Sequence, residues 1–299
     1  MKRLLFAFLL FWCSILAGQK RVSVFDSISK EPIPYVHMVF GDHQGWYSNE
    51  EGIVVLPEEV KIIEVSHISY ENRIVDISQQ DEPIIYLTPL VTMLSPAIVQ
   101  PAGNQKTRIG HAFDKRISIQ GGQNGSSIAE LFRIPEDGSS FPLITSVLLN
   151  LNTVNIKKNM TVTKNDTTYY DGILYVAKLR VDLRCIDQST GGPGESLISG
   201  GVIYSIKDKL SLSTHRVHKI ELPHPILFPA EGVFVVVEWI VTNEVREQDM
   251  VSPSIWRTQS DVSGTSWRKW PPGTPWKQLS SDGVTAPSKA YCIGLELLE

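Results

Sequence analysis

The chain of 299 residues has few cysteines and no block of basic side chains. Three cysteines are too few for a fold held together by disulfides, as in small secreted scaffolds. The 28 basic and 32 acidic side chains are interspersed and give a formal net charge of -4. Because a nucleic-acid site requires a basic surface, we expect no nucleic-acid partner. A hydrophobic content of 42% excludes disorder of the whole chain and is typical of a globular protein.

Common catalytic and cofactor motifs are also missing from the sequence. It contains neither a Gly-x-Ser-x-Gly nucleophile elbow nor a phosphate-binding loop, so we expect a non-enzymatic protein without a cofactor. Acidic residues are plentiful, and a glycosidase that uses two carboxylates is kept as a less favoured alternative.

Residues 215–224 carry histidine or glutamate at every third position and include the His-x-x-Glu spacing of zinc carboxypeptidases. On a helix, residues three apart share a face, but in a strand they alternate between faces. Pro223 and Pro225 prevent a helix here, so His218 and Glu221 are expected to diverge. Since a zinc site needs about three converging protein ligands, we predict no metal site.

The N-terminal residues 1–18 have the pattern of a secretory signal peptide. Lys2 and Arg3 precede the apolar residues 4–16, and a pair of small residues then gives way to the polar Gln19. The apolar run is too short for the roughly 20 residues that span a bilayer, so we expect no transmembrane segment after processing. A lipoprotein anchor would need a cysteine directly after the small residues, whereas Cys13 lies inside the apolar run.

Two cysteines remain in the exported chain, Cys185 and Cys292. An oxidising compartment would allow them to pair. In the strands expected around them, the apolar faces orient the two sulfurs away from each other, which favours two buried thiols over a disulfide. Both outcomes stay open at the level of the sequence.

The rest of the chain predicts an all-β protein with two β-sandwich domains. Residues 232–241 are apolar at nearly every position, which is typical of a central strand covered on both faces. Short strands separated by turns predict a small sandwich of six or seven strands at residues 19–90 and a larger antiparallel, jelly-roll-like sandwich at residues 141–299. Residues 91–140 are expected to be a linker with a short strand and a brief helix, which Ser126 or Ser127 would cap.

Several short motifs in the small sandwich resemble the carboxypeptidase-regulatory-like domain. They are Val24-x-Asp26, Pro-Ile-Pro-Tyr-Val at residues 32–36, Tyr-Ser-Asn-x-x-Gly at 47–52, Val-Ser-His-Ile-Ser-Tyr at 65–70 and Ile-Tyr-Leu at 85–87. The resemblance implies a transthyretin-like β-sandwich and a secreted protein of the bacterial envelope. That family also forms N-terminal extensions of TonB-dependent outer-membrane receptors. The regulatory-like domain is an accessory in that family, so the resemblance implies no peptidase activity. The second half is similar to a β-sandwich that follows this domain in other exported bacterial proteins. The motifs that carry this similarity are Leu-Arg-Val at 179–181, Gly-Pro-Gly-Glu-x-Leu at 192–197, Ile-Glu-Leu at 220–222 and Phe-Val-Val-Val-Glu-Trp at 234–239. His67, on the face of Ile63 and Val65, is expected to be a hydrogen-bonded core histidine.

The most suggestive functional segment is the aromatic loop expected at residues 266–277. It carries Trp267, Trp270 and Trp276 together with basic residues and prolines. A stiff loop that displays indoles beside hydrogen-bond donors suits the apolar faces of sugar rings, so these three residues are the predicted ligand-binding site. The alternative is that the tryptophans cover the end of the sandwich.

From these features we expect an exported, non-enzymatic binding or scaffold protein of the bacterial envelope that binds carbohydrate through the aromatic loop. Its place is the periplasm, the outer-membrane surface or the extracellular space. The alternative is a structural or assembly module that docks to an outer-membrane protein partner through an exposed sheet edge. A hydrolase is less favoured than either.

Overall fold

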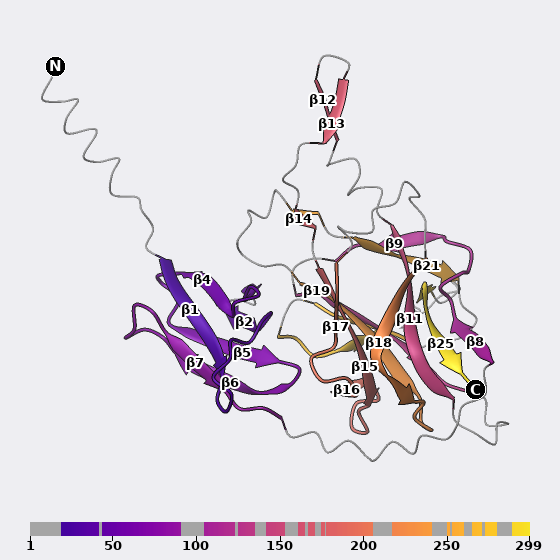
Figure 1. The fold of residues 1–299 in the computed structure, drawn as a ribbon, viewed down its shortest axis with the longest axis horizontal. Coiled ribbons are helices and arrows are strands. Elements are labelled where there is room, and N and C mark those ends of the chain that lie inside the picture. Colours follow the sequence, from indigo (N-terminus) through magenta and orange to yellow (C-terminus); the bar gives the residue numbers. More distant parts are fainter. Residues whose placement is uncertain are drawn as a thin grey trace, which may run out of the picture.

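The computed structural model is an all-β protein in the part of the chain that it describes, where every regular element is a strand (Figure 1). The fold class predicted from the sequence is therefore confirmed. No helix in these residues is long and apolar enough to cross a membrane. The expected signal peptide lies outside the described residues, which are 19–41, 44–90, 105–122, 125–134, 142–152, 161–164, 167–170, 175–176, 178–205, 217–240, 250–251, 253–259, 265–270, 273–279 and 289–299.

Seven strands form the small sandwich of residues 19–90. One sheet has the order β4-β1-β7 and the other has the order β3-β2-β5-β6. Alternate side chains, such as Val22 and Val24 of β1, are fully buried between the two sheets. The strands are β1 (Gln19–Asp26), β2 (His37–Phe40), β3 (Gln44–Tyr47), β4 (Ile53–Pro57), β5 (Ile62–His67), β6 (Tyr70–Asp76) and β7 (Ile84–Leu87).

The large sandwich consists of two packed sheets. The sheet nearer the small sandwich, which we call the proximal sheet, has the order β16-β15-β19-β10-β22-β23, with β17 beside β15. Its strands are β10 (Ser127–Phe132), β15 (Lys178–Ile186), β16 (Pro193–Ser196), β17 (Val202–Tyr204), β19 (Val233–Ile240), β22 (Ser266–Lys269) and β23 (Lys277–Gln278).

The distal sheet has the order β24-β21-β11-β25-β8, with β18 beside β11 and β9 beside β21. Its strands are β8 (Lys106–Gly110), β9 (Ser118–Gln120), β11 (Leu143–Asn152), β18 (Val217–Leu227), β21 (Ser254–Gln259), β24 (Lys289–Tyr291) and β25 (Ile293–Leu298). Two short pairs complete the described strands, β12 (Thr161–Lys164) with β13 (Thr167–Tyr170) and β14 (Tyr175–Val176) with β20 (Met250–Val251).

Strand β19 is central to the proximal sheet, as its apolar sequence predicts. It pairs with β15 on one edge and β10 on the other. Val235, Val237 and Trp239 point into the core between the sheets, whereas Val236 and Glu238 lie on the opposite face. The single charged residue of β19 therefore faces out of the large sandwich.

The helix predicted after Ser126 or Ser127 is wrong, because Ser127–Phe132 form strand β10. All six residues of this segment are buried, and β19 and β22 supply hydrogen-bonding partners on its two edges. Ile128 and Phe132 enter the core between the sheets, and Ala129 and Leu131 pack on the other face. A strand can bury both faces in this way, and this long-range pairing outweighs the local capping signal.

The domain boundary also needs correction. Residues 91–140 are expected from the sequence to be a linker, yet they contain β8, β9 and β10, which are integral strands of the large sandwich. The strands of the larger sandwich therefore start with β8 at Lys106 rather than at residue 141. The short strand predicted within this linker corresponds to β9 (Ser118–Gln120).

Candidate functional site

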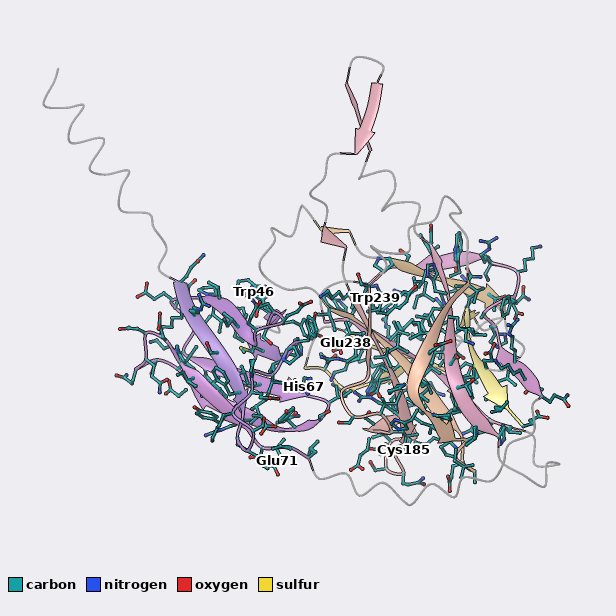
Figure 2. All side chains as sticks on the ribbon, viewed as in Figure 1. Trp46, His67, Glu71, Cys185, Glu238 and Trp239 are labelled. Atoms are coloured by element: carbon teal, nitrogen blue, oxygen red, sulfur yellow. The ribbon has the colours of Figure 1, made fainter. Side chains whose placement is uncertain are left out.

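The outward face of the proximal sheet contacts the small sandwich through a buried polar cluster. Tyr47 Oη of β3 donates a hydrogen bond of 2.6 Å to Glu238 Oε1 of β19. Arg180 Nη1 of β15 donates to Glu238 Oε2 at 3.1 Å, and Arg180 Nη2 donates to the carbonyl oxygen of Tyr35 at 2.8 Å. We call Tyr35, Tyr47, Arg180 and Glu238 the interdomain clamp. Figure 2 shows Glu238 at the junction between the two domains.

The strand register explains why the clamp forms at this place. Arg180 and Glu238 are direct cross-strand partners of β15 and β19, so their side chains emerge side by side on the outward face. Burial raises the pKa of the Glu238 carboxyl, but the charge of Arg180 and the hydrogen bond from Tyr47 outweigh it and lower that pKa. The carboxylate is therefore held in its charged form at the junction.

A second contact joins the turn between β5 and β6 to the loop before β17. The hydroxyl oxygens of Ser69 and Ser199 lie 3.2 Å apart. Gly201 has a φ of 63°, and a Cβ atom there would lie 3.0 Å from Arg180 Cγ and 3.4 Å from Ile68 Cδ1. Glycine thus allows the loop to approach the turn closely.

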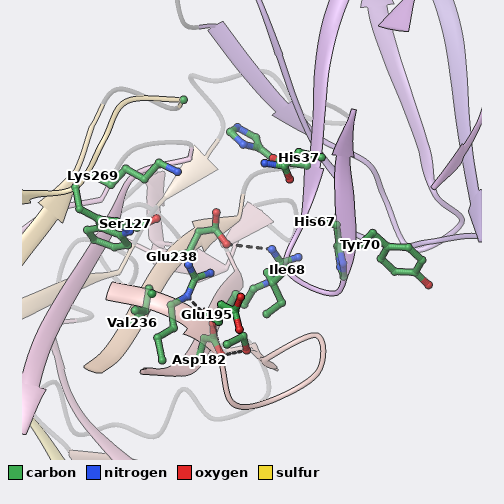
Figure 3. A pocket seen from close by; sticks show the side chains of 18 of the residues that line it. His37, His67, Ile68, Tyr70, Ser127, Asp182, Glu195, Val236, Glu238 and Lys269 are labelled. Atoms are coloured by element: carbon green, nitrogen blue, oxygen red, sulfur yellow. Dashed lines mark hydrogen bonds and ion pairs between the residues drawn. The ribbon is translucent and has the colours of Figure 1, made fainter. Parts of the chain in front are cut away.

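Beside these contacts lies a cleft of about 490 Å³ between the two sandwiches (Figure 3). Both domains contribute walls, and the walls are mainly polar. Side chains from the small sandwich that line the cleft include His37, Glu64, His67 and Asn72. Those from the large sandwich include Arg180, Asp182, Arg184, Glu195, Glu238, Lys269 and Trp276.

Two carboxylates of the cleft, the buried Asp182 and the half-buried Glu238, are already engaged. Asp182 accepts hydrogen bonds from Arg184 Nε at 2.7 Å and from Ser196 Oγ at 2.6 Å. Burial raises the pKa of the Asp182 carboxyl, and the charge of Arg184 opposes that rise. Glu238 is bound by Arg180 and Tyr47. Both carboxylates are therefore hydrogen-bonded to neighbouring side chains of the protein.

Two histidines on the small-sandwich wall are held neutral. His37 stacks on Tyr47 with ring centroids 4.6 Å apart, and burial lowers its pKa to about 4. His67 Nδ1 accepts a hydrogen bond from the backbone N–H of Ser69 at 3.2 Å, and burial lowers its pKa to about 3. His67 is hydrogen-bonded, as predicted, but it is not part of the small-sandwich core. The register shifts between Val65 and His67, which places the histidine at the domain junction instead.

The aromatic segment is not a single loop. Residues 266–269 form strand β22, which pairs with β10 and β23, so the loop prediction is wrong for this part. Trp267 is 8% exposed and packs edge-on against Phe234, with centroids 6.1 Å apart. Trp276 is half-buried and lines the cleft, whereas Trp270 is 43% exposed. The three indoles therefore occupy three different environments, and Trp276 is the one that faces the cleft.

The histidine-rich segment belongs to the distal sheet. His218 and Glu221 lie on β18, and the His218 ring hydrogen-bonds Tyr204 Oη through Nδ1 at 2.8 Å. Within the described ranges, no group of three or more histidine, cysteine, aspartate or glutamate side chains could hold a metal ion. Of the two cysteines, Cys185 is a half-buried free thiol and Cys292 a buried one.

Most of the cleft residues were not predicted from the sequence, although the pattern of charged and apolar residues in β15 indicates a covered polar face. Arg180 and Asp182 alternate with Leu179 and Val181 in that strand, and both charged residues are buried. Charged residues on the outward face of an interior strand indicate that another polar surface covers them.

No protein-family model, curated protein or solved structure significantly matches this chain. Any functional conclusion therefore rests on the fold, the cleft and the sequence itself.

Proposed function

We propose that this chain is an exported, non-enzymatic binding protein of the bacterial envelope and that it binds carbohydrate in the cleft between its two sandwiches. The observation that carries the proposal is the composition of the cleft, in which one indole, Trp276, stands among charged and hydroxyl-bearing side chains from both domains. The signal-like N-terminus and the resemblance of residues 24–87 to the carboxypeptidase-regulatory-like domain support the envelope location.

The chemistry of a sugar ring fits these walls. Its apolar C–H face can lie against the ring of Trp276, and its hydroxyl groups both donate and accept hydrogen bonds. Glu195 and Lys269 supply an acceptor and a donor on the large-sandwich wall. A volume of about 490 Å³ lies in the range of roughly 300 to 1,000 Å³ that is typical of ligand clefts.

Binding is favoured over hydrolysis because of the state of the carboxylates. A glycosidase needs two carboxyl groups that reach the scissile bond, one as a proton donor. Asp182 and Glu238 are each bound by an arginine and by a hydroxyl group. These bonds suit a fixed polar wall and not proton transfer to a substrate.

Tryptophan fluorescence tests the proposal, with soluble polysaccharides titrated into the mature chain. We expect Trp276→Ala to weaken saturable binding about tenfold or more, because it removes the aromatic surface of the cleft. Trp270→Ala is the matched control, since it removes an exposed indole that does not line the cleft, and binding should stay within about twofold of wild type. Equal losses in both variants, or a loss in Trp270→Ala alone, would contradict the proposed site.

A second candidate is the assembly role, with an outer-membrane protein as the partner. The observation that favours it is a pair of exposed isoleucines, Ile62 (60%) and Ile74 (73%), on neighbouring strands β5 and β6. Exposed apolar residues on a sheet face are typical of protein contacts. This role becomes the better explanation if no polysaccharide changes the tryptophan signal.

A further inference from the structure

Lys269 is an unpaired cation inside the cleft. Its side chain extends from the end of β22 toward His37 of the small sandwich (Figure 3). It is half-buried, and it makes no ion pair or hydrogen bond with any other described residue. Burial lowers the pKa of the ammonium group, while the charge of Glu238 opposes that shift. A desolvated ammonium group without a counter-ion is unfavourable, and an anionic ligand group would relieve that cost.

Arg180 adds an independent observation on the same wall. This residue is 3% exposed and lines the cleft. Its two terminal nitrogens are bound to Glu238 and Tyr35, but its buried Nε has no hydrogen-bond acceptor among the described residues. Since buried polar groups are nearly always satisfied, a donor left open on the same cleft wall as the unpaired ammonium group is a second sign that this wall lacks acceptor atoms.

The interior of the large-sandwich wall also carries a net positive charge. It holds three cations, Arg180, Arg184 and Lys269, against the two carboxylates of Asp182 and Glu238. Both carboxylates are paired with arginines, so the positive charge that remains uncompensated is that of Lys269.

The other acidic residues of the cleft are Glu64 and Glu195, and both are solvent-exposed. Because water and salt screen exposed charges, these two carboxylates offset the half-buried ammonium group of Lys269 only in part. The carboxylates of these two residues can accept hydrogen bonds from sugar hydroxyls.

From these observations we infer that the cleft is selective for acidic saccharides, with the oxyanion of a uronate carboxylate or a sulfate ester bound to Lys269. The inference rests on the proposed function and specifies its ligand class. The sugar ring lies against Trp276, and the anionic substituent pairs with the ammonium group, supported by the field of Arg180 and Arg184. A neutral saccharide leaves Lys269 without a counter-ion and therefore binds more weakly.

The test compares three probes, namely oligogalacturonate, sulfated dextran oligomers and neutral dextran oligomers, by calorimetric titration into the mature chain. We expect the acidic probes to bind at least about tenfold more tightly than the neutral one, in line with a charge-assisted hydrogen bond. The two acidic arms distinguish a carboxylate from a sulfate as the preferred group. Lys269→Gln should abolish the preference, and Lys269→Arg should restore most of it.

Lys277→Gln is the matched control, because Lys277 is an exposed lysine on the adjacent strand β23 that does not line the cleft. It should leave all three affinities unchanged, and thermal unfolding should show that every variant is folded. If neutral and acidic probes bind equally and Lys269→Gln changes nothing, the inference is wrong while the proposed function stands. If none of the probes binds, both the inference and carbohydrate binding are wrong.

Discussion

Replacing Arg180 by methionine is expected to lower the free energy of unfolding by about 3 to 5 kcal/mol. Arg180 is 3% exposed and forms the only ion pair of Glu238 among the described residues. Methionine preserves most of the apolar length of the side chain, but it leaves the half-buried Glu238 carboxylate without its cation, with the Tyr47 hydroxyl as its remaining side-chain donor in the described part of the chain. Urea denaturation of the mature chain measures the loss.

A matched control is Arg108→Met. Arg108 contacts Glu296 at 3.3 Å, but its side chain is 58% exposed, so the loss should stay below about 1 kcal/mol. Adding Glu238→Gln to Arg180→Met should recover part of the stability, because it removes the uncompensated charge. If the two arginine variants lose the same amount, the interdomain clamp is not a buried ion pair.

Docking of the two sandwiches is expected to weaken as the pH falls from about 6.5 toward 4. The pKa values of His37 and His67 are about 4 and about 3 in the docked state, below the usual 6.5. Below pH 6.5 the undocked state therefore binds more protons, and acid favours undocking. Arg180 faces both rings and Lys269 faces His37, and both cations oppose protonation, whereas Glu238 favours it.

At pH 5, protonation of each histidine in the undocked state shifts the docking equilibrium toward undocking by at most about 30-fold. Glu238, whose pKa is lowered from 4.5, contributes to undocking only as the pH falls below about 5. Small-angle X-ray scattering should show an increase in the radius of gyration between pH 7 and pH 5. The variant His37→Phe, His67→Asn should lose this response, since phenylalanine can stack on Tyr47 and asparagine can accept the bond from Ser69. Identical scattering at both pH values for the wild type would show that the histidines are not coupled to docking.

The sequence predicts the central strand correctly because the apolar pattern lies within that strand itself. Residues 233–237 are apolar on both alternations, and the strand is central and covered on both faces. The helix prediction for Ser127–Phe132 failed because a serine with a glutamate three residues later resembles a helix start. The strands that pair with this segment lie far along the chain. Local pattern identifies strands well only when long-range pairing agrees with it.

The cleft could not be predicted, because it depends on how two outward faces dock. Tyr47 and Glu238 are 191 residues apart in the chain, and each belongs to a strand whose other residues follow an ordinary core pattern. The sequence predicts Trp276 as a binding residue from its residue type. That Trp267 and Trp270 do not line the cleft with it could not be predicted, because the strand β22 was not expected. The unpaired state of Lys269 is visible only once both walls are in place.

The central claim is that the two sandwiches dock to form one site, and a cross-link tests it most directly. The hydroxyl oxygens of Ser69 and Ser199 lie 3.2 Å apart across the junction. In the variant Ser69→Cys, Ser199→Cys, non-reducing peptide mapping after mild oxidation is expected to find a disulfide between these two positions in nearly all molecules. A protein that remains folded with both thiols free, or in which one of them pairs instead with Cys185, would contradict the docked arrangement and with it the cleft.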